Sequence, residues 1–266
     1  MASPTPLDLR RTAFDSLRAA LSAGHRAASP EAFTLAEESV VRTGLGALDA
    51  ALGGGFPRGV VATLEGPPGS GRSAVAARLL ASATADGGLG ALIETPQGPD
   101  GAYYPPALAA AGVDLDRLLV ITVPDATGVA RAADIVLRSA AFGVVVMPTV
   151  ALRATAWTRL ASLTHRANAL LVALGAAAPD ELRYFASLRV RLRAADVRFA
   201  GGDGLFCTLA GIGVEAAVLK HKRAVPGGRA LFACTTFECD GAPLACVRER
   251  AVAVAAPERD ERRIAL

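Results

Sequence analysis

The sequence predicts an α/β fold with a mostly parallel central sheet, helices on both faces and an antiparallel extension at the C-terminal side. Apolar strand-like segments alternate with helical segments from residue 60 to residue 174, and this alternation is typical of a parallel sheet. The strand at 60–64 leads into a glycine-rich loop that opens a helix. Beyond residue 188 the pattern changes to strands separated by turns, which predicts the antiparallel extension.

The segment before the sheet predicts an amphipathic helical arm. Between residues 7 and 24, arginines and one aspartate occupy one helical face and apolar side chains occupy the other. The apolar face consists of Leu7, Phe14, Leu17 and Leu21. A polar stretch at 27–39 follows, so we expect residues 1–39 to form an arm and linker. The apolar face predicts self-association with a neighbouring copy, and packing on its own domain is the alternative.

The core elements follow in order along residues 40–250. Helices are expected at 72–84, 105–111, 129–140 and 157–166. Parallel strands are expected at 60–64, 89–93, 118–123, 144–147 and 170–174. Antiparallel strands are expected at 188–193, 205–209, 215–219, 229–237 and 244–248, with a tight turn at Asp240-Gly241. We therefore expect one core domain followed by a charged tail at 251–266.

The composition narrows the class of protein. The chain has 266 residues and a formal net charge of +3, which is too small by itself to indicate nucleic-acid binding. No apolar run approaches the ~20 residues of a membrane span, and the N-terminal sequence lacks the features of a secretion signal. The four cysteines fit no zinc-ligand spacing and are expected to be reduced thiols. We therefore expect a cytoplasmic protein without a metal site.

The glycine-rich loop is a phosphate-binding loop (P-loop) with one altered position. Gly66, Gly69, Gly71 and Ser73 fit the loop, but Arg72 stands where the motif requires lysine. The backbone N–H groups and the helix N-terminus can still bind phosphate. The lysine normally reaches the β- and γ-phosphates as a compact ammonium, whereas arginine is larger, planar and forked. The loop therefore predicts a vestigial nucleotide site, at which ATP binding stays open.

The acidic residues that ATP hydrolysis needs are missing from their usual places. A carboxylate that holds Mg²⁺ normally ends the strand after the third helix, and here that strand ends at Met147. A base for the attacking water normally stands just past the neighbouring strand, where this chain has Pro96. Glu94 is acidic but directly continues the apolar strand. We therefore expect no catalytic residues and no efficient hydrolysis.

Two groups of basic residues are candidates for an interaction surface. Arg189, Arg191 and Arg193 alternate with aliphatic residues, so they are expected on one face of a strand. Lys220 and Lys222, the only lysines of the chain, close another strand. Both groups are interpreted as a basic patch for a phosphate backbone or an acidic partner. The alternatives are a solvated strand face for the arginines and an edge guard against strand pairing for the lysines.

Four segments resemble the core of RecA, in the same order. They are 43–59, which enters the P-loop, 112–120, 184–193 and 220–226. The resemblance covers residues 40–238 and implies a RecA-like P-loop core. It places Arg72, Met147 and Pro96 at the positions of the P-loop lysine, the metal aspartate and the catalytic glutamate. It also matches Lys220 and Lys222 to paired lysines that reach a neighbour's nucleotide in RecA filaments.

The departures from RecA point to a more specific resemblance. The segments after residues 147 and 174, which carry DNA-gripping loops in RecA, are short here. The chain is similar to the ImuA family of bacterial mutagenesis cassettes, especially over residues 104–120. That resemblance implies a non-catalytic accessory protein of the SOS response to DNA damage, acting in translesion synthesis near the nucleoid. The implied partners are ImuB (an inactive Y-family polymerase relative), RecA and, indirectly, an error-prone replicative-type polymerase, with weak or indirect DNA contact.

Two other functions stay open. An ATP-dependent DNA-binding recombinase or ATPase would need Arg72 to replace the lysine and Glu94 to hold the metal, with Ser73 as the metal-side hydroxyl. A cell-division inhibitor is the third reading, because shortened RecA-like chains also serve that role. Phosphate release from ATP distinguishes the recombinase reading from the accessory protein.

Overall fold

The computed structural model describes residues 40–96, 102–200, 208–222 and 228–234. These segments include every strand and helix predicted between residues 60 and 174. Three predicted features lie outside the described residues. They are the helical arm with Leu7, Phe14, Leu17 and Leu21, the strand at 244–248 with its Asp240-Gly241 turn, and the charged tail at 251–266.

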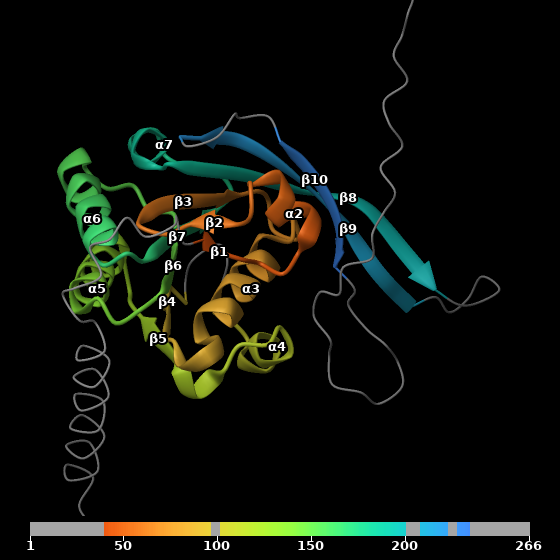
Figure 1. The fold of residues 1–266 in the computed structure, drawn as a ribbon, viewed down its shortest axis with the longest axis horizontal. Coiled ribbons are helices and arrows are strands. Elements are labelled where there is room, and N and C mark those ends of the chain that lie inside the picture. Colours follow the sequence, from red (N-terminus) through yellow and green to blue (C-terminus); the bar gives the residue numbers. More distant parts are fainter. Residues whose placement is uncertain (1–39, 97–101, 201–207, 223–227, 235–266) are drawn as a thin grey trace, which may run out of the picture.

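An eight-stranded sheet forms the centre of the molecule (Figure 1). Its strands, in spatial order, are β10 (Arg229–Cys234), β9 (Thr208–His221), β8 (Leu188–Ala200), β3 (Val60–Glu65), β7 (Leu170–Gly175), β6 (Val144–Pro148), β4 (Gly90–Glu94) and β5 (Leu118–Thr122). From β8 to β5 all neighbours are parallel, whereas β9 and β10 are antiparallel to their neighbours. The predicted fold class is confirmed, with one correction. The strand at 188–193 was expected to be antiparallel, but β8 is parallel to β3, and the antiparallel extension begins with β9.

Helices cover both faces of the sheet (Figure 1). One face carries α2 (Gly46–Ala51), α3 (Arg72–Thr84) and α4 (Pro105–Ala110). The other carries α5 (Ala126–Ser139), α6 (Ala154–Arg166) and α7 (Asp180–Phe185). Smaller elements are the 3-10 turns Ala85–Gly87 and Leu115–Arg117 and a two-stranded ribbon of β1 (Val40–Val41) and β2 (Phe56–Pro57). Among the described helices, none is both long and apolar enough to cross a bilayer.

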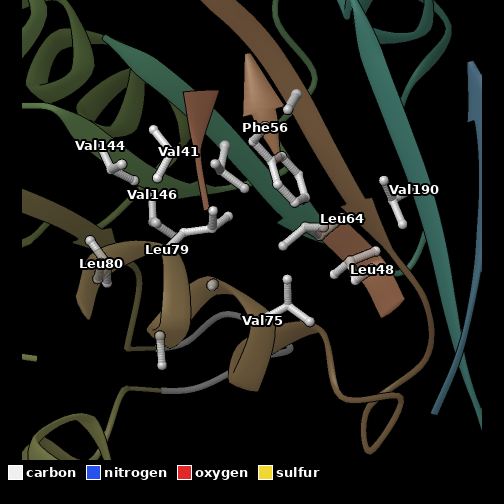
Figure 2. Close-up of a cluster of buried hydrophobic side chains, with 14 of the residues drawn as sticks. Val41, Leu48, Phe56, Leu64, Val75, Leu79, Leu80, Val144, Val146 and Val190 are labelled. Atoms are coloured by element: carbon white, nitrogen blue, oxygen red, sulfur yellow. The ribbon is translucent and has the colours of Figure 1, made fainter. Parts of the chain in front are cut away.

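The sheet lies between two apolar clusters because successive strand residues point to opposite faces. On β6, Val144 and Val146 belong to the cluster under α3, while Val145 and Met147 belong to the cluster under α5 and α6. Figure 2 shows the first cluster, where Leu79 of α3 packs among side chains from several strands. Burying one such leucine contributes roughly 2 kcal/mol, so both faces hold the sheet firmly. The loops at its carboxyl edge are therefore built on a rigid base.

Two of the C-terminal strands, β8 and β9, are longer than the sequence predicted. Two separate strands were expected at 205–209 and 215–219, but β9 runs without a break from Thr208 to His221. A turn was expected between these two strands, whereas in the structure residues 210–214, with Gly211 and Gly213, lie within β9. Gly213 pairs with Asp196 next to a shift of register, and a Cβ at Gly213 would lie 3.1 Å from the Asp196 Cβ. Glycine inside a strand often marks such a bulge.

Candidate functional site: the loop between β3 and α3

The glycine-rich loop lies at the carboxyl end of β3, where its glycines satisfy two geometric demands. Gly69 and Gly71 have φ angles of 80° and 87°, a left-handed conformation that residues with a Cβ rarely adopt. Gly71 also caps the start of α3, and a Cβ there would lie 2.8 Å from Val214 Cγ2 on β9. At Gly66, a Cβ would lie 2.5 Å from Ser70 Oγ. The loop therefore has the left-handed turns of a phosphate cradle and is packed tightly against β9.

Arg72 turns back into this loop. Its side chain is almost completely buried, and Nη1 donates a hydrogen bond to the carbonyl oxygen of Gly66. Desolvation by burial lowers the pKa of the guanidinium, an effect opposed by the nearby Tyr103. The cation thus joins the last part of the loop to its first residue. In a working P-loop, the lysine at this position points to the phosphates instead.

Tyr103 closes the loop from the other side. Its hydroxyl oxygen is buried close to the Ser73 side chain, but the two groups are not aligned for a regular hydrogen bond. Burial raises the Tyr103 pKa to about 12, an effect opposed by the neighbouring Ser73 and Arg72 and reinforced by Glu94. The Tyr103 backbone N–H donates to Glu94 Oε2 at 3.0 Å. Tyr103, Arg72 and Glu94 therefore form one packed unit beside the loop.

Two carboxylates lie at the carboxyl edge of the sheet, and both have protein partners. Glu94 accepts hydrogen bonds from the Tyr103 N–H and, at 3.2 Å, from Thr122 Oγ1. Glu65, which ends β3, accepts hydrogen bonds from Thr63 Oγ1 at 2.9 Å and from Arg189 at two points. Burial alone would raise the Glu65 pKa, but the hydrogen bonds from Arg189 and Thr63 and the Arg189 charge outweigh it, so the pKa is lowered. Both carboxylates are engaged in holding the fold.

The positions that resemble the metal and catalytic positions of RecA carry no ligating group. Met147 is fully buried in the cluster under α5 and α6, and Pro96 follows β4. At the end of β7, Gly175 lies against the side chain of Thr149. Within the described segments, no group of three or more His, Cys, Asp or Glu side chains is arranged to hold a metal ion.

One face of β8 carries Arg189, Arg191 and Arg193, as their alternation with Leu188, Val190 and Leu192 predicts. Their environments differ. Arg189 is paired with the buried Glu65, and Arg193 donates from Nε to Glu215 Oε2 at 2.6 Å. Arg191 is exposed. Arg189 therefore stabilises the sheet, whereas the Arg193 side chain is 67% exposed and still offers N–H donors to solvent.

The two lysines also have separate roles. Lys220 Nζ donates to the carbonyl oxygens of Arg183 at 2.7 Å and Tyr184 at 3.0 Å, near the C-terminal end of α7. A cation in this position donates to the carbonyl groups that have no partner at the end of the helix, and it interacts favourably with the negative end of the helix dipole. Burial lowers the Lys220 pKa, and the charges of Lys222 and Arg189 lower it further. The Lys222 side chain is exposed, and its backbone N–H bonds the Ser187 carbonyl at 2.9 Å.

Sequence reasoning missed Tyr103 and Glu65 as part of this site. Tyr103 lies thirty residues after the loop, and no motif connects the two. Glu65 did leave a signal, because a carboxylate at the end of a fully buried apolar strand needs a partner. Arg189 on the adjacent strand supplies it.

Comparison with known proteins agrees with the fold and the loop. Residues 32–159 match the model of the RecA N-terminal domain. The chain is 36% identical to RecA of Picosynechococcus sp. over 113 residues, which are 42% of this chain and 31% of that protein. It is 40% identical to RecA of Salinispora tropica over 116 residues, 43% of this chain and 32% of that protein. The aligned part thus spans about a third of these relatives.

The structural comparison extends further along the chain. The crystal structure of the RadB recombinase superposes with a TM-score of 0.56 at 19% identity, covering 74% of this chain and 96% of RadB. The fold and the loop therefore define a RecA-like P-loop protein. Its fold is that of the RecA recombinases, and its loop is closed by its own arginine.

Proposed function

We propose that this chain is a non-catalytic RecA-like accessory protein that acts through protein contacts in DNA-damage-induced translesion synthesis. The observation that carries the proposal is the buried hydrogen bond from Arg72 to the Gly66 carbonyl. A cation committed to the loop itself is unavailable to the phosphates whose charge it would otherwise stabilise. In this proposal the RecA-like core provides surfaces for binding other proteins and does not hydrolyse ATP.

The surrounding residues support this proposal. Phosphoryl transfer depends on a metal-bound carboxylate and a residue that orients the attacking water. Met147 and Pro96 offer neither, and Glu65 and Glu94 already accept hydrogen bonds from protein groups. If Glu94 bound a metal ion, it would lose its hydrogen bond from the Tyr103 backbone N–H. That half-buried N–H would then have no acceptor.

The proposed partners follow from the resemblance to the ImuA family. They are an ImuB-type inactive Y-family polymerase and RecA, with an error-prone replicative-type polymerase reached indirectly. The pairing of Arg189 with the buried Glu65 takes one of these arginines out of the strand's basic face, which favours weak or indirect DNA contact over a dedicated DNA groove on β8. Location in the cytoplasm near the nucleoid belongs to the same proposal.

A second function, an ATP-dependent recombinase or ATPase, has one observation in its favour. Ser73 is an exposed residue at the end of the loop, and it occupies the position of the metal-side hydroxyl in P-loops. This function requires Arg72 to leave its buried position and Tyr103 to move aside. That rearrangement breaks the Arg72 hydrogen bond and exposes more of the partly buried Tyr103 side chain, which makes it the weaker candidate.

A binding experiment tests the accessory role. The full chain is immobilised and offered a purified ImuB-type protein and, separately, RecA from the same organism. The proposal expects binding of the ImuB-type protein at micromolar concentration or better, unchanged in the presence of ATP and Mg²⁺. Failure to bind either protein over that range counts against the accessory role, whatever the result of an ATPase assay.

A further inference from the structure

The helices α5 and α6 lie on the face of the sheet opposite the P-loop helix α3 (Figure 1). A groove lies between these two helices. Its volume is about 390 Å³, within the range of roughly 300–1,000 Å³ typical of binding pockets. Its floor is apolar and formed by Ala130, Ala156 and Leu160. Ile135 also lines the groove, and its side chain is 63% exposed, so it offers an apolar contact at the surface.

One carboxylate, that of Asp134, forms ion pairs with two of the arginines that line the groove. Asp134 accepts hydrogen bonds from Arg159 of α6, one of them from Nη2 at 3.3 Å, and its Oδ2 lies 3.0 Å from Arg138 Nε. The hydrogen bond from Arg159 lowers the Asp134 pKa, and the charges of Arg138 and Arg159 act in the same direction. The aspartate therefore stays ionised and holds two guanidiniums at the rim.

The rim carries more positive than negative charge. Arg131, Arg138 and Arg159 line the groove together with the single carboxylate of Asp134. The side chains of Arg138 and Arg159 are 57% and 60% exposed, so each presents further N–H donors to solvent. An apolar floor between such donors is complementary to an amphipathic helix whose apolar stripe is flanked by carboxylates.

The chain's own terminal segments lack this chemistry. The helical pattern at 7–24 carries three arginines against two aspartates, Asp8 and Asp15, so its charge is net positive and a basic rim would disfavour it. The tail at 251–266 has equal numbers of acidic and basic residues. Nucleic acid also fits poorly, because the lining offers apolar groups and no aromatic ring for base stacking.

We propose that the α5–α6 groove is a docking site for an acidic amphipathic helix of another protein. The inference deepens the proposed accessory function by naming a surface and the chemistry of the partner. Apolar residues one helical turn apart would rest on Ala156 and Leu160 and cover Ile135. Carboxylates beside them would reach Arg131, Arg138 and Arg159.

Peptide selection on the full chain tests this docking site. The probe is a phage-displayed library of random 20-residue peptides, panned against the immobilised protein. We expect enriched peptides with apolar residues at helical spacing flanked by Asp or Glu. Against Arg131→Glu/Arg138→Glu, the best of them should bind at least about tenfold more weakly, because like charges then face each other. A version with lysine in place of each acidic residue should regain affinity for this double variant.

Two further variants keep the test specific. Ile135→Ser should also weaken binding, because it removes the exposed apolar contact. Arg42→Glu is the matched control, since Arg42 is an exposed arginine next to the cluster on the opposite face. All these positions are exposed, so thermal melts should show folded proteins.

Three results would overturn the docking site. They are no enrichment, enriched peptides that bind the double variant equally well, and tight single-stranded DNA binding that the double variant abolishes. ATP turnover by the same protein would remove the proposed function but leave this groove intact. Failure of the selection would remove the groove and leave the closed P-loop unaffected.

Discussion

Arg189 on β8 and Glu65 at the end of β3 form a two-point ion pair beside the closed P-loop. Nε lies 2.8 Å from Oε1 and Nη2 lies 3.1 Å from Oε2. The Glu65 side chain is 1% exposed and that of Arg189 is 15% exposed, so the pair is largely shielded from water. An arginine that the sequence assigned to an interaction surface instead fastens β8 to the strand that carries the loop.

Breaking this pair should cost stability. Arg189→Met leaves the Glu65 charge buried without its partner and is expected to lower the free energy of unfolding by about 3 kcal/mol. Glu65→Gln combined with Arg189→Met should recover part of the loss, because no charge then remains buried. Urea denaturation measures both, with Arg191→Met as an exposed control on the same strand. A similar loss in the control would contradict the assignment.

The close packing of the loop predicts a difference between two glycines. Gly53→Ala and Gly71→Ala both place a Cβ on left-handed backbone, at φ angles of 75° and 87°. Gly53 has no neighbour within 4 Å, so we expect only the conformational cost of about 1 kcal/mol. Gly71→Ala should cost about 1–2 kcal/mol more, because its Cβ meets Val214. Val214→Ala is then added to each glycine variant, and urea denaturation measures the free energy of unfolding. Val214→Ala should destabilise the Gly71→Ala protein less than the Gly53→Ala protein, because it removes the methyl groups that the new Cβ would meet. Equal losses of stability from Val214→Ala in the two glycine variants would contradict this prediction, because they would show that the loop moves to make room for the Cβ.

Tyr103 predicts a loss of stability at alkaline pH. An unfolded tyrosine ionises near pH 10, whereas burial raises the pKa of Tyr103 to about 12. The stability that the neutral Tyr103 provides is fully present below pH 10. It is lost as the pH rises to 12, because over this range the tyrosine ionises in the unfolded chain but not in the folded one. The loss should approach about 3 kcal/mol at most. Stability curves of wild type and Tyr103→Phe from pH 8 to 11 test this, and parallel curves would refute it.

Restoring the lysine should not restore hydrolysis. Arg72→Lys removes the hydrogen bond that closes the loop and supplies the ammonium that P-loops use, so nucleotide binding is expected to improve. Turnover should remain at background, since Met147 and Pro96 supply no carboxylate. Calorimetry with ATP and Mg²⁺, followed by a phosphate-release assay, separates the two effects. Turnover by this variant would mean that another residue holds the metal.

The sequence predicted a mostly parallel sheet because the signals for its strands and helices are local. Five apolar strands alternate with amphipathic helices, and each pattern can be recognised within a few residues. The helix boundaries were less accurate. We expected a helix from residue 129, but α5 begins at Ala126, where the Asp125 side chain accepts a hydrogen bond from the Gly128 N–H at 2.7 Å. This cap adds almost one turn before the first buried residue.

The site depended on contacts that a linear reading cannot supply. The Arg72 substitution was visible, but the acceptor of its hydrogen bond was not, because an arginine at that position reaches ligand and loop equally well. Tyr103 comes to the loop only through the packing of α4 and the anchor on Glu94. The pairing of Arg189 with Glu65 required knowing that β8 is parallel to β3 and adjacent to it.

The most direct test of the closed P-loop is phosphate release by the purified full chain in ATP and Mg²⁺, with and without single-stranded DNA. The account predicts release no faster than the buffer background under both conditions, with the same result for Arg72→Ala. Release above background that disappears in Arg72→Ala would contradict it, because Arg72 would then act on the phosphates rather than on its own loop.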